Sequence, residues 1–210
     1  NSLRAMATTM VRYAYGLPFA CVYLGYLLWA NPEWLSQPQA AEVLSNHRFI
    51  LFASAASIAQ IGATFALIKV FAQRNFAVGT SFAKTEAIQV AILGVVFFGD
   101  YLNVYGWLAV IIGVLGTLIV SGLKTLKGAS PVATLYGIAS GALFALTSLC
   151  LREASISLGM PLVLSAAITL IFMVMQQTLV CAVYLWLVEP QQWRKMRGVQ
   201  GACWFVGATS

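Results

Sequence analysis

Residues 161–188 read PLVLSAAITLIFMVMQQTLVCAVYLWLV, a stretch without a single charged side chain. A helix that crosses a bilayer needs about 20 mostly apolar residues, so this stretch predicts a membrane-spanning helix. Six complete stretches of this kind are present, and a seventh begins near residue 200. They lie at 7–29, 49–72, 76–98, 103–123, 132–151 and 161–188. The alternation typical of a membrane barrel is absent, which favours an all-α, polytopic transmembrane helix bundle.

The composition excludes an ordinary soluble domain. Of the 210 residues, 60% are hydrophobic and 9% are charged, whereas soluble domains carry about a quarter charged residues. A chain this small could not hide that apolar excess from water, so its natural partner is a lipid bilayer. The net charge of +6 does not indicate nucleic acid, because the basic residues lie mostly in short connections between apolar stretches.

A repeated motif order predicts two related halves. The sequence YLLWANPEW at 26–34 reappears as YLWLVEPQQW at 184–193, and FASAAS at 52–57 resembles FVGATS at 205–210. This order predicts that helix 7–29 corresponds to helix 161–188, and we expect one further helix before Asn1. We therefore expect an internal fragment of a ten-helix protein, with truncated ends and an inverted five-plus-five repeat. The domains are predicted at 1–123 for the first repeat, 124–131 for a linker and 132–210 for the second repeat.

A family resemblance agrees with this plan. The sequences FAKTEAI at 82–88 and LGVVFFGD at 93–100, followed by a Gly-rich helix at 106–116, resemble the fourth and fifth helices of the drug/metabolite transporter (DMT) superfamily. The EamA-type permeases are its most similar branch, and YGIASGALFA at 136–145 resembles the opening helix of their second half. The resemblance covers helices two to seven and part of eight. It implies a metabolite exporter of the bacterial cytoplasmic (inner) membrane.

The chain also departs from that family. Many relatives carry proline near the middle of the fourth helix, where this sequence reads KTE at 84–86. The related small multidrug exporters use an acid inside their first helix, and its repeat counterpart here, helix 132–151, contains none. A drug/proton exchange mechanism of that type is therefore not predicted.

Glu86 is the strongest candidate for a functional residue. It is predicted near the middle of helix 76–98, where a charged side chain is expensive and must face a cavity or a partner. Gln89 lies three residues further and on the same helix face. Glu86 and Gln89 could bind substrate or a coupling proton, or could instead form a structural hydrogen bond to another helix.

Further candidates are less distinctive. Three glutamines within the predicted membrane spans could bind a polar substrate or form a hydrogen bond to a neighbouring helix. Lys84 points to a different face from Glu86, and Arg12 with Tyr13 lies near a helix entrance, where snorkelling is the simpler interpretation. The remaining candidates of this set are Gln60, Gln176 and Gln177.

Small residues predict tight helix packing on two faces. Ala133, Gly137, Gly141 and Ala145 recur every four residues in helix 132–151. Glycines 106, 113 and 116 mark a similar face in helix 103–123. Membrane orientation stays open, since the charge bias of seven basic residues against two and the topology usual in the family disagree.

These observations predict a secondary-active transporter of small polar metabolites such as amino acids, working by alternating access of its two repeats. Protons are a candidate coupling ion, and the assembly is a monomer or a homodimer. The main alternative is a passive channel or a structural membrane protein. A membrane-embedded enzyme is not predicted, because the sequence has one histidine and one deep acid rather than a catalytic cluster. No cofactor or metal is predicted.

Overall fold

The protein is an all-α membrane protein. The computed structural model describes residues 5–36, 42–72, 86–99, 101, 103–121, 131–188 and 190–191, and every regular element within these ranges is a helix. Two compact units are formed, unit 1 by Asn1–Ile58 with Cys150–Ser210 and unit 2 by Ala59–Leu149.

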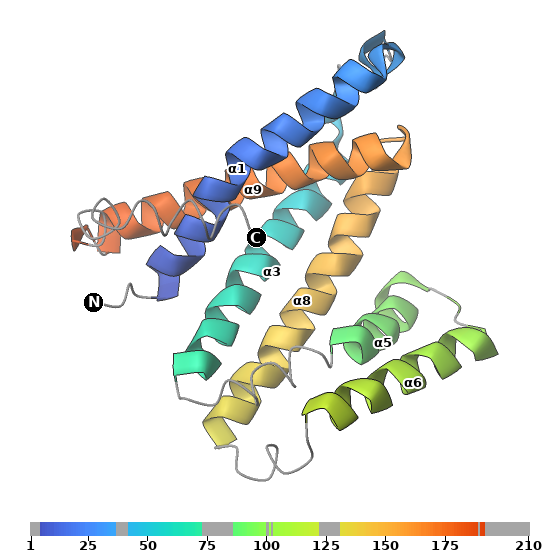
Figure 1. The fold of residues 1–210 in the computed structure, drawn as a ribbon, viewed down its shortest axis with the longest axis vertical. Helices are drawn as coiled ribbons and strands as arrows, with labels where there is room; N and C mark the ends of the chain where they lie inside the picture. The colour runs from blue at the N-terminus through green and yellow to red at the C-terminus, as the bar shows by residue number, and fades with distance from the viewer. Residues whose placement is uncertain are drawn as a thin grey trace. The chain divides into compact units, whose positions relative to one another are not determined.

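Unit 1 is built around two long helices, α1 (Ala5–Ala30) and α9 (Leu162–Val188), which lie side by side (Figure 1). The short 3-10 helices η1 (Pro32–Ser36) and η2 (Val43–Ser45) follow α1. The start of α3 (His47–Ala72) and the end of α8 (Pro131–Ser157) complete the described part of this unit.

Unit 2 contains the rest of α3 and α8, together with α5 (Glu86–Phe98) and α6 (Val104–Ser121). Helices α5 and α6 are neighbours. Helix α5 ends at Phe98 and is followed by Gly99, whose φ of 65° is a left-handed conformation that glycine adopts without a steric penalty. Asn103 then caps α6 by accepting a 2.8 Å hydrogen bond from the Gly106 N–H.

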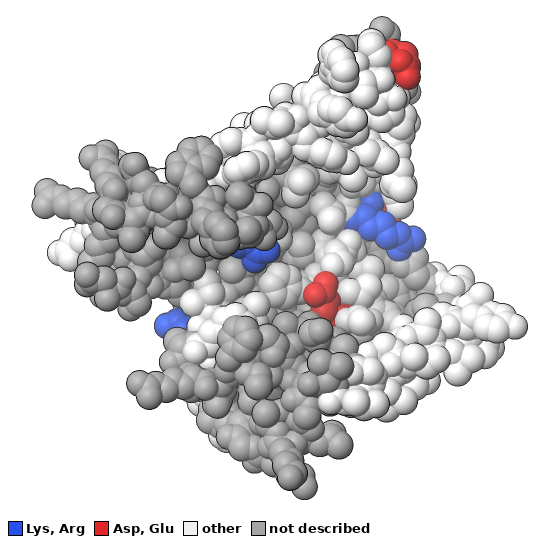
Figure 2. Space-filling view, in the orientation of Figure 1, with Lys and Arg blue, Asp and Glu red and all other residues white. Residues whose placement is uncertain are grey.

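Among the described residues, four helices are long and apolar enough to cross a membrane. They are Thr9–Ala30, His47–Phe71, Pro131–Ser157 and Leu162–Val188, while α5 and α6 are shorter apolar helices. Large apolar side chains such as Leu51, Met175 and Trp186 are exposed, as expected for a surface that contacts lipid. On the face drawn in Figure 2, uncharged residues make up most of the described surface, with a few separate charged side chains among them.

The helices begin and end close to the predicted residues, with two differences. Helix α8 continues to Ser157, beyond the predicted end at 151. Helix α5 is described only from Glu86, so the first part of the predicted helix 76–98 lies outside the described residues. The seventh stretch and the predicted linker at 124–131, apart from Pro131, also lie outside them.

The apolar core of unit 1 lies where α3 begins and α8 ends. Phe49 is fully buried, and its ring meets Phe172 of α9 edge to face at 5.2 Å between centroids. Trp34 of η1 packs against the same cluster. The buried members of this cluster are Phe49, Ala53, Ala154, Leu158, Met160 and Leu164. The start of α3 and the segment from the end of α8 to the start of α9, which are far apart in sequence, are therefore packed together in this cluster.

The small-residue face of α8 is buried, as predicted. Ala133 and Ala145 are 0% exposed, and Gly137 and Gly141 are also buried. On the same helix, the Ser140 hydroxyl donates a 3.0 Å hydrogen bond to the Ala63 carbonyl of α3. The close approach that small residues permit thus brings a hydroxyl of one helix to the backbone of the other.

The matching prediction for α6 is not confirmed. Gly113 and Gly116 are exposed, and a Cβ added at either position would meet no other described residue within 4 Å. The spacing of glycines predicts a helix face that can pack closely, but it does not predict whether another helix lies against that face.

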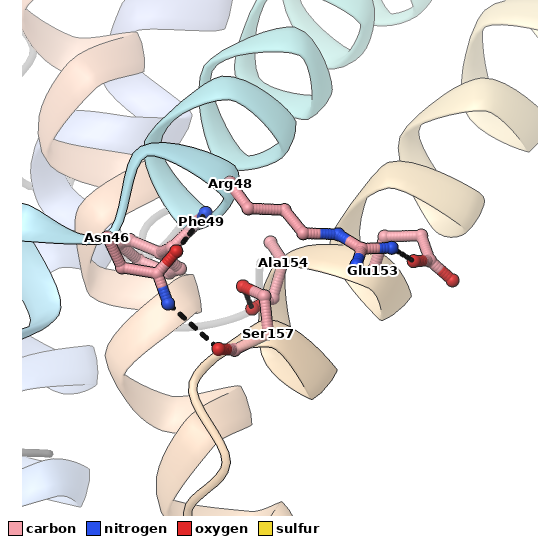
Figure 3. A network of polar contacts seen from close by, with 6 residues as sticks. All are labelled: Asn46, Arg48, Phe49, Glu153, Ala154 and Ser157. Atoms are coloured by element: carbon pink, nitrogen blue, oxygen red, sulfur yellow. Dashed lines mark hydrogen bonds and ion pairs between the residues drawn. The ribbon is translucent and has the colours of Figure 1, made fainter.

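Asn46 joins the start of α3 to the end of α8 (Figure 3). Its side-chain Oδ1 accepts a 3.0 Å hydrogen bond from the Phe49 N–H and so caps α3. Its Nδ2 donates a 2.8 Å bond to the Ser157 carbonyl, one of the carbonyls that a helix C-terminus leaves unpaired. Next to it, Arg48 and Glu153 form an ion pair at 3.0 Å.

Replacing Asn46 with alanine removes both bonds, so we expect it to lower the free energy of unfolding of the detergent-solubilised protein by about 1–3 kcal/mol. Asn46→Asp keeps the cap but loses the donor to Ser157, and is expected to cost less. Thermal unfolding of the two variants provides the measurement. Equal losses would show that the bond to Ser157 carries the effect and that the cap contributes nothing.

Candidate functional site

The Glu86 carboxylate is bound by a hydroxyl of another helix. Ser148 of α8 donates a 3.0 Å hydrogen bond to Glu86 Oε1, and the contact is partly buried within unit 2. A hydrogen bond to an ionised carboxylate is about twice as strong as one between neutral groups. The acid is thus held in place by a neutral partner from another helix.

Two predicted glutamines belong to the same unit. Gln89 lies one helical turn after Glu86 on α5, is partly buried and makes a contact of its own. Gln60 of α3 is also partly buried and makes a contact. Unit 2 therefore carries three of the predicted polar residues, with Glu86 as the charged one.

The predicted glutamines of α9, Gln176 and Gln177, both lie in unit 1. Gln176 donates a 3.0 Å hydrogen bond from Nε2 to the Ser54 hydroxyl of α3. Its Oε1 atom is buried and has no hydrogen-bond partner among the described residues. Gln177 is 0% exposed and makes a contact of its own. The Oε1 atoms of Gln89 and Gln177 are likewise buried and accept no hydrogen bond from a described residue, so all three glutamines keep a buried acceptor oxygen.

The remaining candidates are less informative. Tyr13 is 4% exposed and makes a contact, so its ring belongs to the interior of unit 1. Arg12 is partly buried in the first turns of α1. Lys84 lies outside the described residues. The described candidates are thus divided between units 1 and 2.

Ser148 and Ser54 were missed by the sequence reasoning. Both are hydroxyl residues inside apolar helices, and such residues recur throughout the chain without marking a site. Their location in membrane-spanning stretches does indicate that each hydroxyl needs a hydrogen-bond partner. Choosing the partner requires knowledge of which helix lies alongside.

The described residues contain no group of three or more His, Cys, Asp or Glu side chains that could hold a metal ion. Comparison with protein-family models, with curated proteins and with solved structures finds no match to this chain. The resemblance to the drug/metabolite transporters therefore stays a prediction from sequence motifs.

Proposed function

We propose that the chain is part of a multi-pass, secondary-active transporter that moves small polar metabolites, such as amino acids, across the bacterial inner membrane. The observation that carries the proposal is the Glu86 carboxylate on an apolar helix, bound by Ser148. A purely structural bundle gains little from a lone acid in this position, because the charged form is costly in lipid.

Ser148 lies in the apolar part of α8, nine residues before the helix ends at Ser157 and four residues before the first charged residue, Arg152. The Glu86 carboxylate therefore meets α8 inside the apolar stretch, about 6 Å along the helix from its charged end. A carboxylate in such a stretch needs a partner or a cavity, which supports a polar site at this position.

The chemistry of the pair suits a transported cation or proton. An ionised Glu86 accepts the hydrogen of Ser148 and can also bind the ammonium group of a substrate. A protonated Glu86 becomes a donor, and the serine oxygen can then accept. The contact between α5 and α8 can therefore persist in both protonation states, as a site that alternates between substrate and proton requires.

The test uses the full-length protein in proteoliposomes. Labelled amino acids, nucleobases and organic cations are supplied, and uptake is measured with and without unlabelled substrate inside. Saturable uptake that is accelerated by internal substrate supports a transporter. Uptake that rises linearly with concentration and shows no counterflow would instead support a channel, and would overturn the proposal.

A further inference from the structure

A surface cleft of about 300 Å³ lies in unit 1, where η2 and the start of α3 meet the end of α8. It is lined by Glu42, Val43, Ser45, Asn46, Ser157 and Leu158. This volume is at the lower end of the range found for small-molecule sites. The cleft is made from different residues than the Glu86 pair, so it requires a separate explanation.

The walls of the cleft are fixed by the contacts beneath it. Asn46 bonds both the Phe49 N–H and the Ser157 carbonyl, and so ties one wall to the other (Figure 3). Leu158 belongs to the buried apolar cluster of unit 1, and Val43 packs against that cluster. A ligand would therefore enter a preformed shape, which lowers the entropic cost of binding.

The lining favours a ligand that donates hydrogen bonds and carries positive charge. The side-chain nitrogen and oxygen of Asn46 are already engaged, and the Ser157 hydroxyl donates to the Ala154 carbonyl at 2.7 Å. Among the side chains of the residues that line the cleft, this leaves the Glu42 carboxylate and the Ser45 hydroxyl as acceptors. None of the six lining residues is basic, and the nearby Arg48 is paired with Glu153.

We propose that this cleft binds a primary ammonium group, with Glu42 as its counter-ion, Ser45 as a second acceptor, and Val43 and Leu158 as contacts for the adjoining carbon atoms. A primary ammonium matches the set because it has three N–H donors and a compact charge. The proposal is independent of the transport function, since it does not involve Glu86.

Two sources could supply this group. The cleft lies at the ends of two apolar spans, between the residues that precede His47 and the residues Ser157 and Leu158. Helix ends are at the level of the lipid headgroups, where phosphatidylethanolamine presents a primary ammonium. A dissolved amine of similar size could reach the same cleft from water.

The experiment uses the full-length protein in nanodiscs of phosphatidylethanolamine or phosphatidylcholine with identical acyl chains. Native mass spectrometry after release from the discs counts the lipids that stay bound. Phosphatidylcholine has the same charge but no N–H donor, so it tests hydrogen bonding directly. In parallel, phenethylamine is titrated into phosphatidylcholine discs, and the thermal unfolding temperature is followed.

Glu42→Gln is the test variant, and Glu33→Gln, another exposed carboxylate on the same connection, is its matched control. We expect at least tenfold preferential retention of phosphatidylethanolamine, or a saturable phenethylamine shift, that is lost in Glu42→Gln and kept in Glu33→Gln. The first result identifies a lipid headgroup and the second a dissolved amine. Absence of both in the wild type, or equal binding by Glu42→Gln, would overturn the proposal.

Discussion

Glu86→Gln is expected to raise the KM for a cationic or zwitterionic substrate by roughly 10- to 100-fold and to abolish accumulation driven by a proton gradient. A hydrogen bond to a charged group contributes about 1.5–3 kcal/mol, and the substitution removes the charge while keeping the size and an acceptor for Ser148. Flux and counterflow in proteoliposomes measure the effect.

The same substitution is not expected to reduce stability. A charged residue near the bilayer centre costs about 2.5–3.5 kcal/mol on insertion scales, so neutralising it should leave the unfolding temperature unchanged or higher. Glu33→Gln on η1 serves as the control, since that carboxylate is exposed. Unchanged KM and unchanged proton dependence in Glu86→Gln would assign the acid a structural role and remove the main support for the proposed function.

Gln176→Met is expected to change stability and transport in opposite directions. A buried polar atom without a partner costs about 1–3 kcal/mol, and methionine fills a similar volume without that atom. Ser54, which loses the amide, can bond a backbone carbonyl of its own helix. We expect a rise of several degrees in the unfolding temperature. If Oε1 receives a substrate donor during transport, the KM rises about tenfold.

Destabilisation is the outcome that would contradict this expectation. A lower unfolding temperature for Gln176→Met, with unchanged transport, would show that the bond to Ser54 outweighs the unbonded Oε1 and would assign Gln176 a structural role. Gln177 is not a neutral control, because its Oε1 is also buried without a hydrogen bond.

The positions of the helices could be predicted because apolar stretch length is a local property. Hydropathy, however, locates the lipid boundary rather than the end of a helix, which explains the error at α8. The prediction ended at 151 because Arg152 and Glu153 follow. In the structure, Glu153 pairs with Arg48 across unit 1, and α8 continues to Ser157.

The partners of the candidate residues could not be predicted in the same way. Glu86 could be singled out because a charge is rare in an apolar helix, but Ser148 looks like many other hydroxyl residues in the chain. Gln176 and Gln177 were equivalent in sequence. They differ in the structure because adjacent helical residues point about 100° apart, so only one of them meets Ser54.

The turn between α8 and α9 has a consequence for biogenesis. Only four residues, Leu158 to Pro161, separate the two helices, and Gly159 takes a φ of 64° within them. A connection of four residues is too short for one helix to enter the lipid while the other remains in water. The pair should therefore enter the membrane from the translocon as one hairpin, with the adjacent Arg152 and Glu153 adding no net charge near its tip.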